Sequence, residues 1–192
     1  KPSVGWVELA PDDNSDYYQQ ERPKYFDSTN GVKNTSLLHA VKITGLTPGT
    51  KYRYRVYSQE VLDHQGVEVM YGKVAATDVY GAEPLIFTTN DRNKPETSFV
   101  MINDIHGRTD DIPQLLKVAD YKNTDMVIFN GDMLSQLKNE EELFTGFMDV
   151  SIDMFAKETP MYYARGNHET RGSFAIAFQD YFSPKQEHIY YM

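Results

Sequence analysis

Three short stretches of this sequence place metal-binding residue types beside glycines. Their donors and neighbouring glycines are, in chain order, Asp104, His106 and Gly107; Gly131 and Asp132; Gly166, Asn167 and His168. Carboxylate, imidazole and carboxamide groups in combination suit borderline divalent ions such as Mn²⁺, Fe²⁺ or Zn²⁺. Glycines permit tight turns and close backbone approach. The three stretches therefore predict a metal site, provided that the fold brings them together.

Each stretch ends a continuous apolar run of the kind that forms a buried strand. The runs are SFVMIND (98–104), MVIFNGD (126–132) and PMYYARGN (160–167), with helix-like segments at 110–122 and 139–158 between them. This alternation predicts parallel strands that are buried on both faces. Ligands bind beyond the carboxyl ends of such strands, so we expect the donors to converge there.

The first 90 residues follow a different pattern. Short or alternating apolar segments rich in Tyr, Val, Thr and Phe predict antiparallel strands. These segments cover residues 3–9, 37–46, 51–61, 67–77 and 84–89. The polar stretch 12–34 is expected to be a loop or an irregular insertion. LTPGTKYRYRV (46–56) resembles the strand–turn–strand signature of fibronectin type III domains, with Tyr52 at the aromatic position, and a small β-sandwich is predicted.

A polar, proline-containing segment, NDRNKPET (90–97), separates the two patterns. Domain boundaries fall in segments of this composition. The predicted fold class is therefore a β-sandwich domain over residues 1–92, followed by an α/β domain over residues 93–192.

The three motif stretches carry a family resemblance. DIHG (104–107), NGD (130–132) and RGNHE (165–169) resemble, in order and spacing, the first three blocks of calcineurin-like metallophosphoesterases. The resemblance implies the N-terminal half of that family's two-layer-sheet fold. A preceding β-domain resembles the arrangement of purple acid phosphatases. However, His106 and Ser135 stand where that subgroup has a glycine and a tyrosinate ligand, so no tyrosinate–iron chromophore is expected.

The resemblance also implies roles for the metal-binding residues. Asp104 and His106 would hold one ion, Asp132 would bridge two ions, and Asn167 would ligate the second through its amide oxygen. The cofactors implied are two Mn, Fe or Zn ions. A water between them would act as the hydroxide nucleophile on a phosphorylated small molecule or protein, which makes the enzyme a phosphatase or phosphodiesterase.

Three further residues receive roles from the same match. His168 would lie outside the metal shell and donate a proton to the leaving oxygen or stabilise the transferring phosphoryl group. Arg165 would contact a phosphate oxygen, and Glu169 would orient a neighbouring group.

The family's later histidine blocks do not occur in this sequence. We therefore expect a fragment of a larger enzyme that binds metal weakly and hydrolyses phosphoesters poorly or not at all. An incomplete fold would also leave a sheet uncovered, which predicts dimerisation or strand exchange.

The composition of the chain excludes some classes of protein. The chain has 192 residues, 40% of them hydrophobic, and a net charge of −9. This acidic balance argues against a dedicated nucleic-acid binder, and no apolar run is long enough to span a membrane. The absence of cysteine excludes disulfides and thiolate metal sites. Because the chain begins at Lys1, without a methionine, we expect export to the periplasm or the extracellular space rather than a cytoplasmic location.

Two other functions compete with this interpretation. A fibronectin-like adhesion or binding module with a degenerate α/β remnant is the alternative, but such a remnant would be expected to lose some of the metal-binding residues. A nucleotide-binding domain is disfavoured because NDIHGRTDD (103–111) lacks a G-x-G-x-x-G loop. The histidines outside the motifs, which are His39, His64 and His188, are expected to be structural or exposed to solvent.

Overall fold

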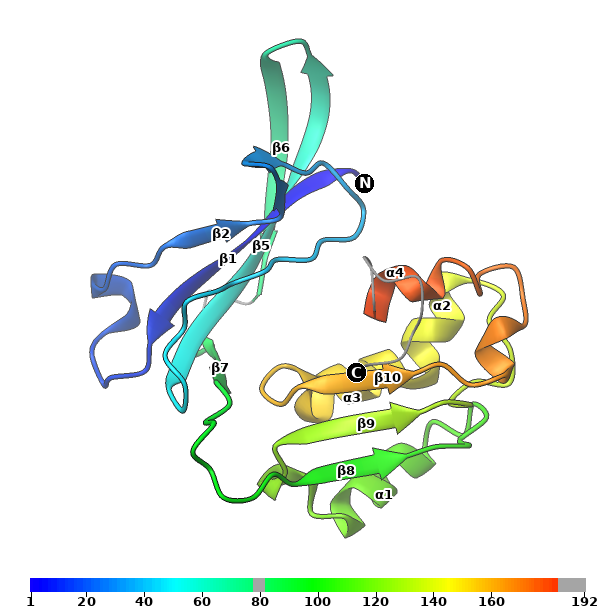
Figure 1. The fold of residues 1–192 in the computed structure, drawn as a ribbon. Coiled ribbons are helices and arrows are strands. Elements are labelled where there is room, and N and C mark those ends of the chain that lie inside the picture. Colours follow the sequence, from blue (N-terminus) through cyan, green and yellow to red (C-terminus); the bar gives the residue numbers. More distant parts are fainter. Residues whose placement is uncertain (78–81, 183–192) are drawn as a thin grey trace. The chain divides into compact units, whose positions relative to one another are not determined.

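The chain forms two compact units, Lys1–Arg92 and Asn93–Met192. The computed structural model describes residues 1–77 and 82–182 (Figure 1). His188 and the end of the chain lie outside the described residues. The first unit is rich in strands, and the second combines strands and helices.

The N-terminal unit is built on a five-stranded antiparallel sheet in the order β2-β1-β5-β6, with β7 also paired to β5. The strands are β1 (Ser3–Pro11), β2 (Lys24–Phe26), β5 (Lys51–Gln65), β6 (Glu68–Ala76) and β7 (Leu85–Thr88). A short 3-10 helix, η1 (Tyr17–Gln19), follows β1, and β3 (Ser28–Thr29) pairs with β4 (Val32–Lys33). Beyond the main sheet, β5 and β6 continue as a long hairpin closed at Gly66, which has a φ of 62°.

The antiparallel prediction is correct for four of the five expected strands, and two details differ. Residues 37–46 contain no strand, because only the neighbouring residue Ser36 finds a partner, in an isolated bridge to Ser3. Conversely, residues 24–26, expected to be irregular, pair with β1. As a result, the described residues of the N-terminal unit hold one five-stranded sheet and a two-stranded ladder, and the two facing sheets of a sandwich are not both present among them.

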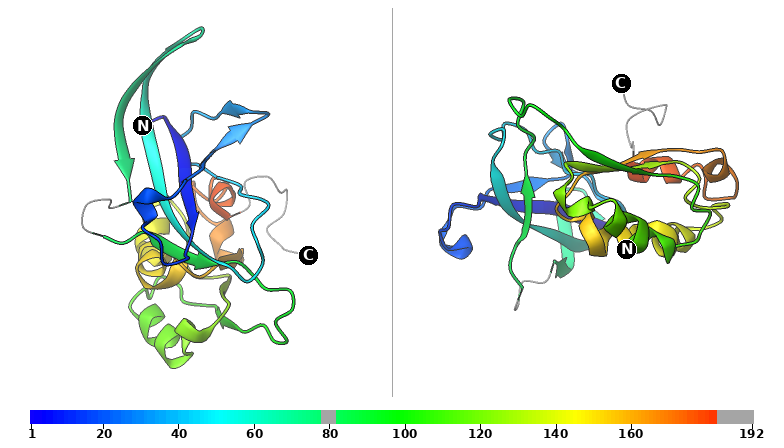
Figure 2. Two further views of the ribbon diagram at one scale, coloured as in Figure 1. Left: turned by 90° about the vertical axis from the view of Figure 1, so that its left-hand side faces the viewer. Right: turned by 90° about the horizontal axis from the view of Figure 1, so that it is seen from below.

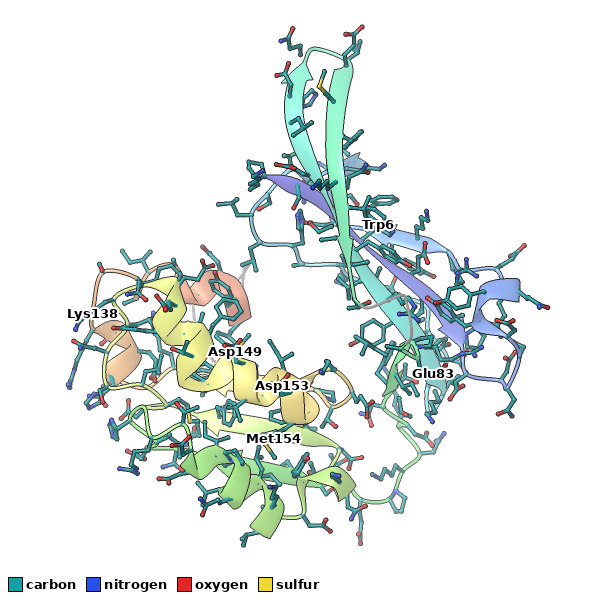
Figure 3. The ribbon with its side chains drawn as sticks, turned by 180° about the vertical axis from the view of Figure 1, so that it is seen from behind. Trp6, Glu83, Lys138, Asp149, Asp153 and Met154 are labelled. Atoms are coloured by element: carbon teal, nitrogen blue, oxygen red, sulfur yellow. The ribbon has the colours of Figure 1, made fainter. Side chains whose placement is uncertain are left out.

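Aromatic side chains hold the centre of this sheet. Trp6 lies opposite Tyr57 and Phe26 on the neighbouring strands, and its ring stacks on Tyr57 with a centroid separation of 5.1 Å (Figure 3). Cross-strand aromatic pairs of this kind each contribute roughly 0.2–1 kcal/mol to sheet stability. Trp6 is also the only tryptophan of the chain, so its fluorescence reports on this unit alone.

His39 is structural, as expected. Its Nδ1 donates to Asp27 Oδ2 at 2.9 Å, and its Nε2 lies 2.9 Å from Ser3 Oγ. This network attaches the segment after Ser36 to β1. Burial raises the pKa of Asp27, but hydrogen bonds from His39 and Asn34 outweigh burial, so its pKa lies below the ordinary value of 3.8. His64, at the end of β5, is exposed.

The C-terminal unit contains three parallel strands in the order β10-β9-β8, as predicted. They are β8 (Phe99–Ile102), β9 (Met126–Asn130) and β10 (Met161–Ala164). In register, Val100 lies beside Val127, and Phe129 beside Tyr163. All three strands therefore end at one edge of the sheet.

Each of the three parallel strands is followed in the sequence by helical segments. The first is α1 (Asp111–Val118), with the 3-10 turn η2 (Tyr121–Asn123) behind it. Residues 140–156 form one continuous helix made of α2 (Glu140–Leu143), η3 (Phe144–Met148), α3 (Asp149–Ser151) and η4 (Ile152–Ala156), of which η3 and η4 are π-helical turns. Its N-cap, Asn139, accepts a hydrogen bond from the Glu142 amide at 2.9 Å. Asp149 and Asp153 lie one turn apart along this helix (Figure 3). After β10 come η5 (His168–Thr170) and α4 (Phe178–Phe182).

The helices cover one face of the sheet, where Phe129, Phe147 and Tyr163 are fully buried. Figure 2 (right) shows α1 (green) and α3 (yellow) on the same side of the strands. On the other face, Phe99 is 54% exposed and Met101 is 50% exposed. The prediction of burial on both faces is therefore wrong for the described residues, because no described helix packs on that side. Nor does any helix in the described part of the chain combine the length and apolar character needed to cross a membrane.

Candidate metal centre

The three predicted motif loops meet beyond the carboxyl ends of the parallel strands. Asp104 lies two residues after β8, and Asp132 lies two residues after β9. Backbone hydrogen bonds join these two loops: the amide of Asp104 donates to Gly131 O at 3.2 Å, and the amide of His106 donates to Asp132 O at 2.9 Å. A third bond, from the Gly107 amide to Met133 O at 2.8 Å, continues the series. The loops are therefore fixed to each other and not only to their own strands.

The backbone of this region adopts left-handed conformations that side-chain-bearing residues seldom take. Asp104, His106 and Asp132 have φ values of 59°, 53° and 54°. They are three of the six non-glycine residues with positive φ in the described part of the chain. Such conformations cost roughly 1–3 kcal/mol each and persist where surrounding contacts enforce them, most often at functional sites. Here the inter-loop hydrogen bonds enforce them.

Two glycines let the second and third loops approach each other. A Cβ added to Gly131 would lie 2.7 Å from Gly166 Cα, and one added to Gly166 would overlap Asp132 Oδ1. A larger residue at either position would force the loops apart. The predicted role of these glycines in close backbone approach is confirmed.

The side chain of Glu169 joins the same two loops through hydrogen bonds to their backbone amides. It is fully buried, and its carboxylate accepts three backbone hydrogen bonds. Oε2 accepts from the amides of Asp132 and Gly166, each at 3.0 Å, and Oε1 accepts from the amide of Leu134 at 3.1 Å. Burial first, and then the charge of Glu169, raise the pKa of the neighbouring Tyr163 above its ordinary value. Glu169 thus positions the loop that carries Asp132.

The donors themselves form a cluster. His106, Asp132 and His168 each offer a ligand atom, and these atoms lie within 4.8 Å of one another. The rings of His106 and His168 have a centroid separation of 4.4 Å. Asp104 Oδ1 lies 3.6 Å from His106 Nε2, and the His168 amide donates to Asp132 Oδ1 at 2.9 Å. His168, expected beside the metal shell, therefore contributes a nitrogen to the cluster itself.

Asn167 completes the set through its carboxamide, which can take two orientations. In one, its nitrogen donates to Asp132 Oδ2 at 3.0 Å and its oxygen accepts from Arg171 Nη2 at 2.9 Å. In the other, its oxygen faces Asp132 Oδ2 and could serve as a metal ligand beside that carboxylate. Together with the imidazoles, this pair of oxygens forms a donor set that fits Mn²⁺, Fe²⁺ or Zn²⁺.

Two arginines lie near the centre, and the phosphate contact expected of Arg165 stays a prediction. Arg165, predicted to contact phosphate, is exposed and has no hydrogen bond or ion pair with any described residue. Arg171, which lies outside the three motifs, reaches both Asn167 and His168. A signal was present, because Arg171 follows His168 by three residues and η5 is a turn of 3-10 helix, in which such residues lie on the same side.

Comparisons with known proteins agree with this geometry. The sequence pattern of calcineurin-like phosphoesterases matches residues 97–192, which is half of the chain. Among solved structures, the fold is similar to that of a purple acid phosphatase isolated from yellow lupin (Lupinus luteus) seeds, with a TM-score of 0.56 and 14% identity. That match covers 88% of this chain and 31% of the lupin chain, so the present chain spans about a third of that protein. No curated protein matches in sequence. With three motif loops joined at the strand ends and a matching sequence pattern over half its length, the chain belongs to the calcineurin-like phosphoesterase family.

Proposed function

We propose that this chain provides ligands of a two-metal centre that hydrolyses phosphoesters. The observation that carries the proposal is the convergence of Asp104, His106 and Asp132 on left-handed loops that are hydrogen-bonded to each other. Membership of the calcineurin-like phosphoesterase family supports the reaction class. The likeness to the lupin purple acid phosphatase supports the fold.

In this proposal Asp104 and His106 hold one ion, Asp132 is shared between two ions, and Asn167 offers its amide oxygen to the second. When bound, the ions activate water as a nucleophile and neutralise charge on the phosphoryl group. Asn167 can serve only in the orientation that turns its oxygen toward Asp132. The net result is a phosphatase or phosphodiesterase that needs Mn²⁺, Fe or Zn²⁺.

His168 is the candidate proton donor to the leaving oxygen. Its Nδ1 lies 2.9 Å from the carbonyl oxygen of Ser135, which can only accept a hydrogen bond, so Nδ1 carries a hydrogen and the ring orientation is fixed. This contact leaves Nε2 as the nitrogen that acts at the centre. A positioned histidine of this kind contributes roughly 10²- to 10⁴-fold to a hydrolytic rate.

The test is a comparison of two aspartates that share the left-handed backbone conformation. Asp132→Asn removes the proposed bridging ligand, whereas Asp120→Asn alters an aspartate with the same φ of 54° outside the centre. We expect Asp132→Asn to weaken Mn²⁺ binding, measured by isothermal titration calorimetry, by at least about 100-fold. The slow hydrolysis of p-nitrophenyl phosphate expected of this chain should fall with it, and Asp120→Asn should match the wild type in both measurements. Wild-type Mn²⁺ affinity in Asp132→Asn would exclude this centre.

A further inference from the structure

Arg171 brings a guanidinium group to the centre. Its Nη2 lies 2.9 Å from the Asn167 carboxamide oxygen in one orientation of that group, and its Nη1 lies 3.2 Å from His168 Nδ1. In the orientation that the proposed metal site requires, the Asn167 NH₂ group faces Arg171 instead, and Nη2 has no acceptor there. Arg171 is exposed to solvent, and its guanidinium group contacts two residues of the candidate metal centre. These contacts suggest that Arg171 has a function at the centre.

The backbone beneath this side chain is anchored on both sides. The Arg171 amide donates to His168 O at 3.0 Å, and Arg171 O accepts from the Leu137 amide at 2.7 Å. The next residue, Gly172, has a φ of 106°, and a Cβ there would overlap the Leu137 carbonyl. The base of Arg171 is thus fixed relative to His168, which limits the positions that the guanidinium can reach.

The contact with His168 leaves donors of Arg171 without an acceptor. Because His168 Nδ1 donates its hydrogen to Ser135 O, the Arg171 Nη1 group meets an N–H and not a lone pair. A guanidinium has five N–H donors and no acceptor. Nη1 and its neighbours therefore remain free to bind an anionic oxygen of a molecule that occupies the centre.

The positive charge of Arg171 also has no acidic partner among the described residues. By contrast, Arg108 pairs with Asp111 at 3.0 Å and donates to Asp104 O at 3.2 Å. Arg165 is likewise unpaired among these residues, but no hydrogen bond joins it to Asn167 or His168, both of which Arg171 contacts. The planar guanidinium matches the oxygens of a phosphate and binds them more strongly than a neutral donor does. Arg171 is the side chain at this centre best suited to a phosphoryl group.

We propose that Arg171 binds a terminal oxygen of the substrate phosphoryl group and makes the centre selective for phosphomonoesters. The proposal rests on the phosphoester hydrolase function above. A monoester has three terminal oxygens and a diester has two. If the metal ions engage two of them, only a monoester keeps a third oxygen for Arg171. Loss of the guanidinium should therefore harm monoesters and leave diesters little changed.

The experiment uses Arg171→Gln, which keeps length and polarity, and Arg171→Lys, which keeps the charge without the planar fork. Arg92→Gln, at the exposed arginine that ends the N-terminal unit, is the matched control. Inorganic phosphate binding to the Mn²⁺-loaded protein is measured by calorimetry. We expect Arg171→Gln to weaken it by roughly 10- to 100-fold, Arg171→Lys to fall between, and Arg92→Gln to equal the wild type. Mn²⁺ affinity should be unchanged in all three.

Kinetics separate substrate recognition from a purely structural effect. For Arg171→Gln we expect kcat/KM to fall by roughly 100-fold for p-nitrophenyl phosphate and by less than about threefold for bis(p-nitrophenyl) phosphate. An equal fall for both substrates, or unchanged phosphate affinity, would overturn the proposal. If the wild type binds Mn²⁺ and phosphate but hydrolyses neither ester, the hydrolase function fails in this chain, and phosphate affinity alone decides the role of Arg171. If the wild type binds Mn²⁺ but no phosphate, the proposal for Arg171 is wrong.

Discussion

The buried carboxylate of Glu169 allows a sharp test of how the centre is held together. It accepts hydrogen bonds from the amides of Asp132, Leu134 and Gly166. In Glu169→Gln, the amide oxygen can still face the first and third of these donors, but the new NH₂ group must then face the amide of Leu134. The variant therefore loses one charge-assisted hydrogen bond, and the Leu134 N–H and the new NH₂ group face each other without an acceptor.

The size of the effect follows from those two changes. A hydrogen bond to a charged group contributes about 1.5–3 kcal/mol, and a buried unsatisfied donor costs about 1–3 kcal/mol. Because these terms overlap, we expect the free energy of unfolding of the C-terminal unit to fall by about 2–3 kcal/mol. Mn²⁺ affinity should fall as well, although Glu169 is no metal ligand, since the Asp132 loop loses its anchor.

Amide hydrogen exchange followed by NMR is the direct assay. The Leu134 amide should lose protection by roughly 30- to 150-fold in Glu169→Gln, which is the factor that corresponds to 2–3 kcal/mol. Glu158→Gln, at an exposed glutamate of the same unit, is the control and should leave exchange unchanged. If Leu134 keeps wild-type protection in Glu169→Gln, the carboxylate does not anchor this loop and the reasoning is wrong.

Three further perturbations test other parts of the structure. Gly166→Ala adds a methyl group that overlaps Asp132, so the free energy of unfolding should fall by about 1–3 kcal/mol. Mn²⁺ binding, measured by calorimetry, should also weaken. Unchanged Mn²⁺ binding would contradict the close approach of the loops. Because the pKa of Asp27 is lowered in the fold, its contribution to stability is present above pH 3.8 and is lost as the pH falls through that lowered pKa. Urea unfolding monitored by Trp6 fluorescence should therefore show a larger acid-induced loss in the wild type than in Asp27→Asn, and equal losses would count against the network. Met101→Lys places a charge on the exposed sheet face and should reduce any concentration-dependent association seen by light scattering, whereas equal masses at all concentrations would exclude association through that face.

The parallel strands and their motif loops could be predicted from the sequence because the signals are local. Continuous apolar runs ending in Asp104, Asp132 and Asn167 specify buried strands with polar ends, and the parallel-sheet rule then places those ends at one edge. The alternating segments before residue 90 predict most of the antiparallel sheet for the same reason. The sequence-based prediction failed where strand formation depended on a pairing partner. Residues 37–46 alternate but form no strand, whereas residues 24–26, within a mostly polar stretch, pair with β1.

The detailed geometry of the centre could not be predicted, because it depends on contacts between separate loops. Nothing in the local pattern indicates that Glu169 bonds to Leu134. The spacing of Arg171 from His168 becomes a signal only once the 3-10 turn between them is known. An uncovered sheet was expected from the missing histidine blocks, but the sequence did not indicate that the exposed face would be the one carrying Met101, since a continuous apolar run does not say which face a helix will cover.

The sequence alone determined which candidate metal ligands this protein has, the order in which the strands deliver them, and the family that their pattern resembles. Only the tertiary structure decided how close His106, Asp132 and His168 lie and which arginine faces them. The physical reason is that residue types and periodicity are properties of short segments. Distances and orientations in the centre are set by hydrogen bonds between separate loops, such as the one from the His106 amide to Asp132 O.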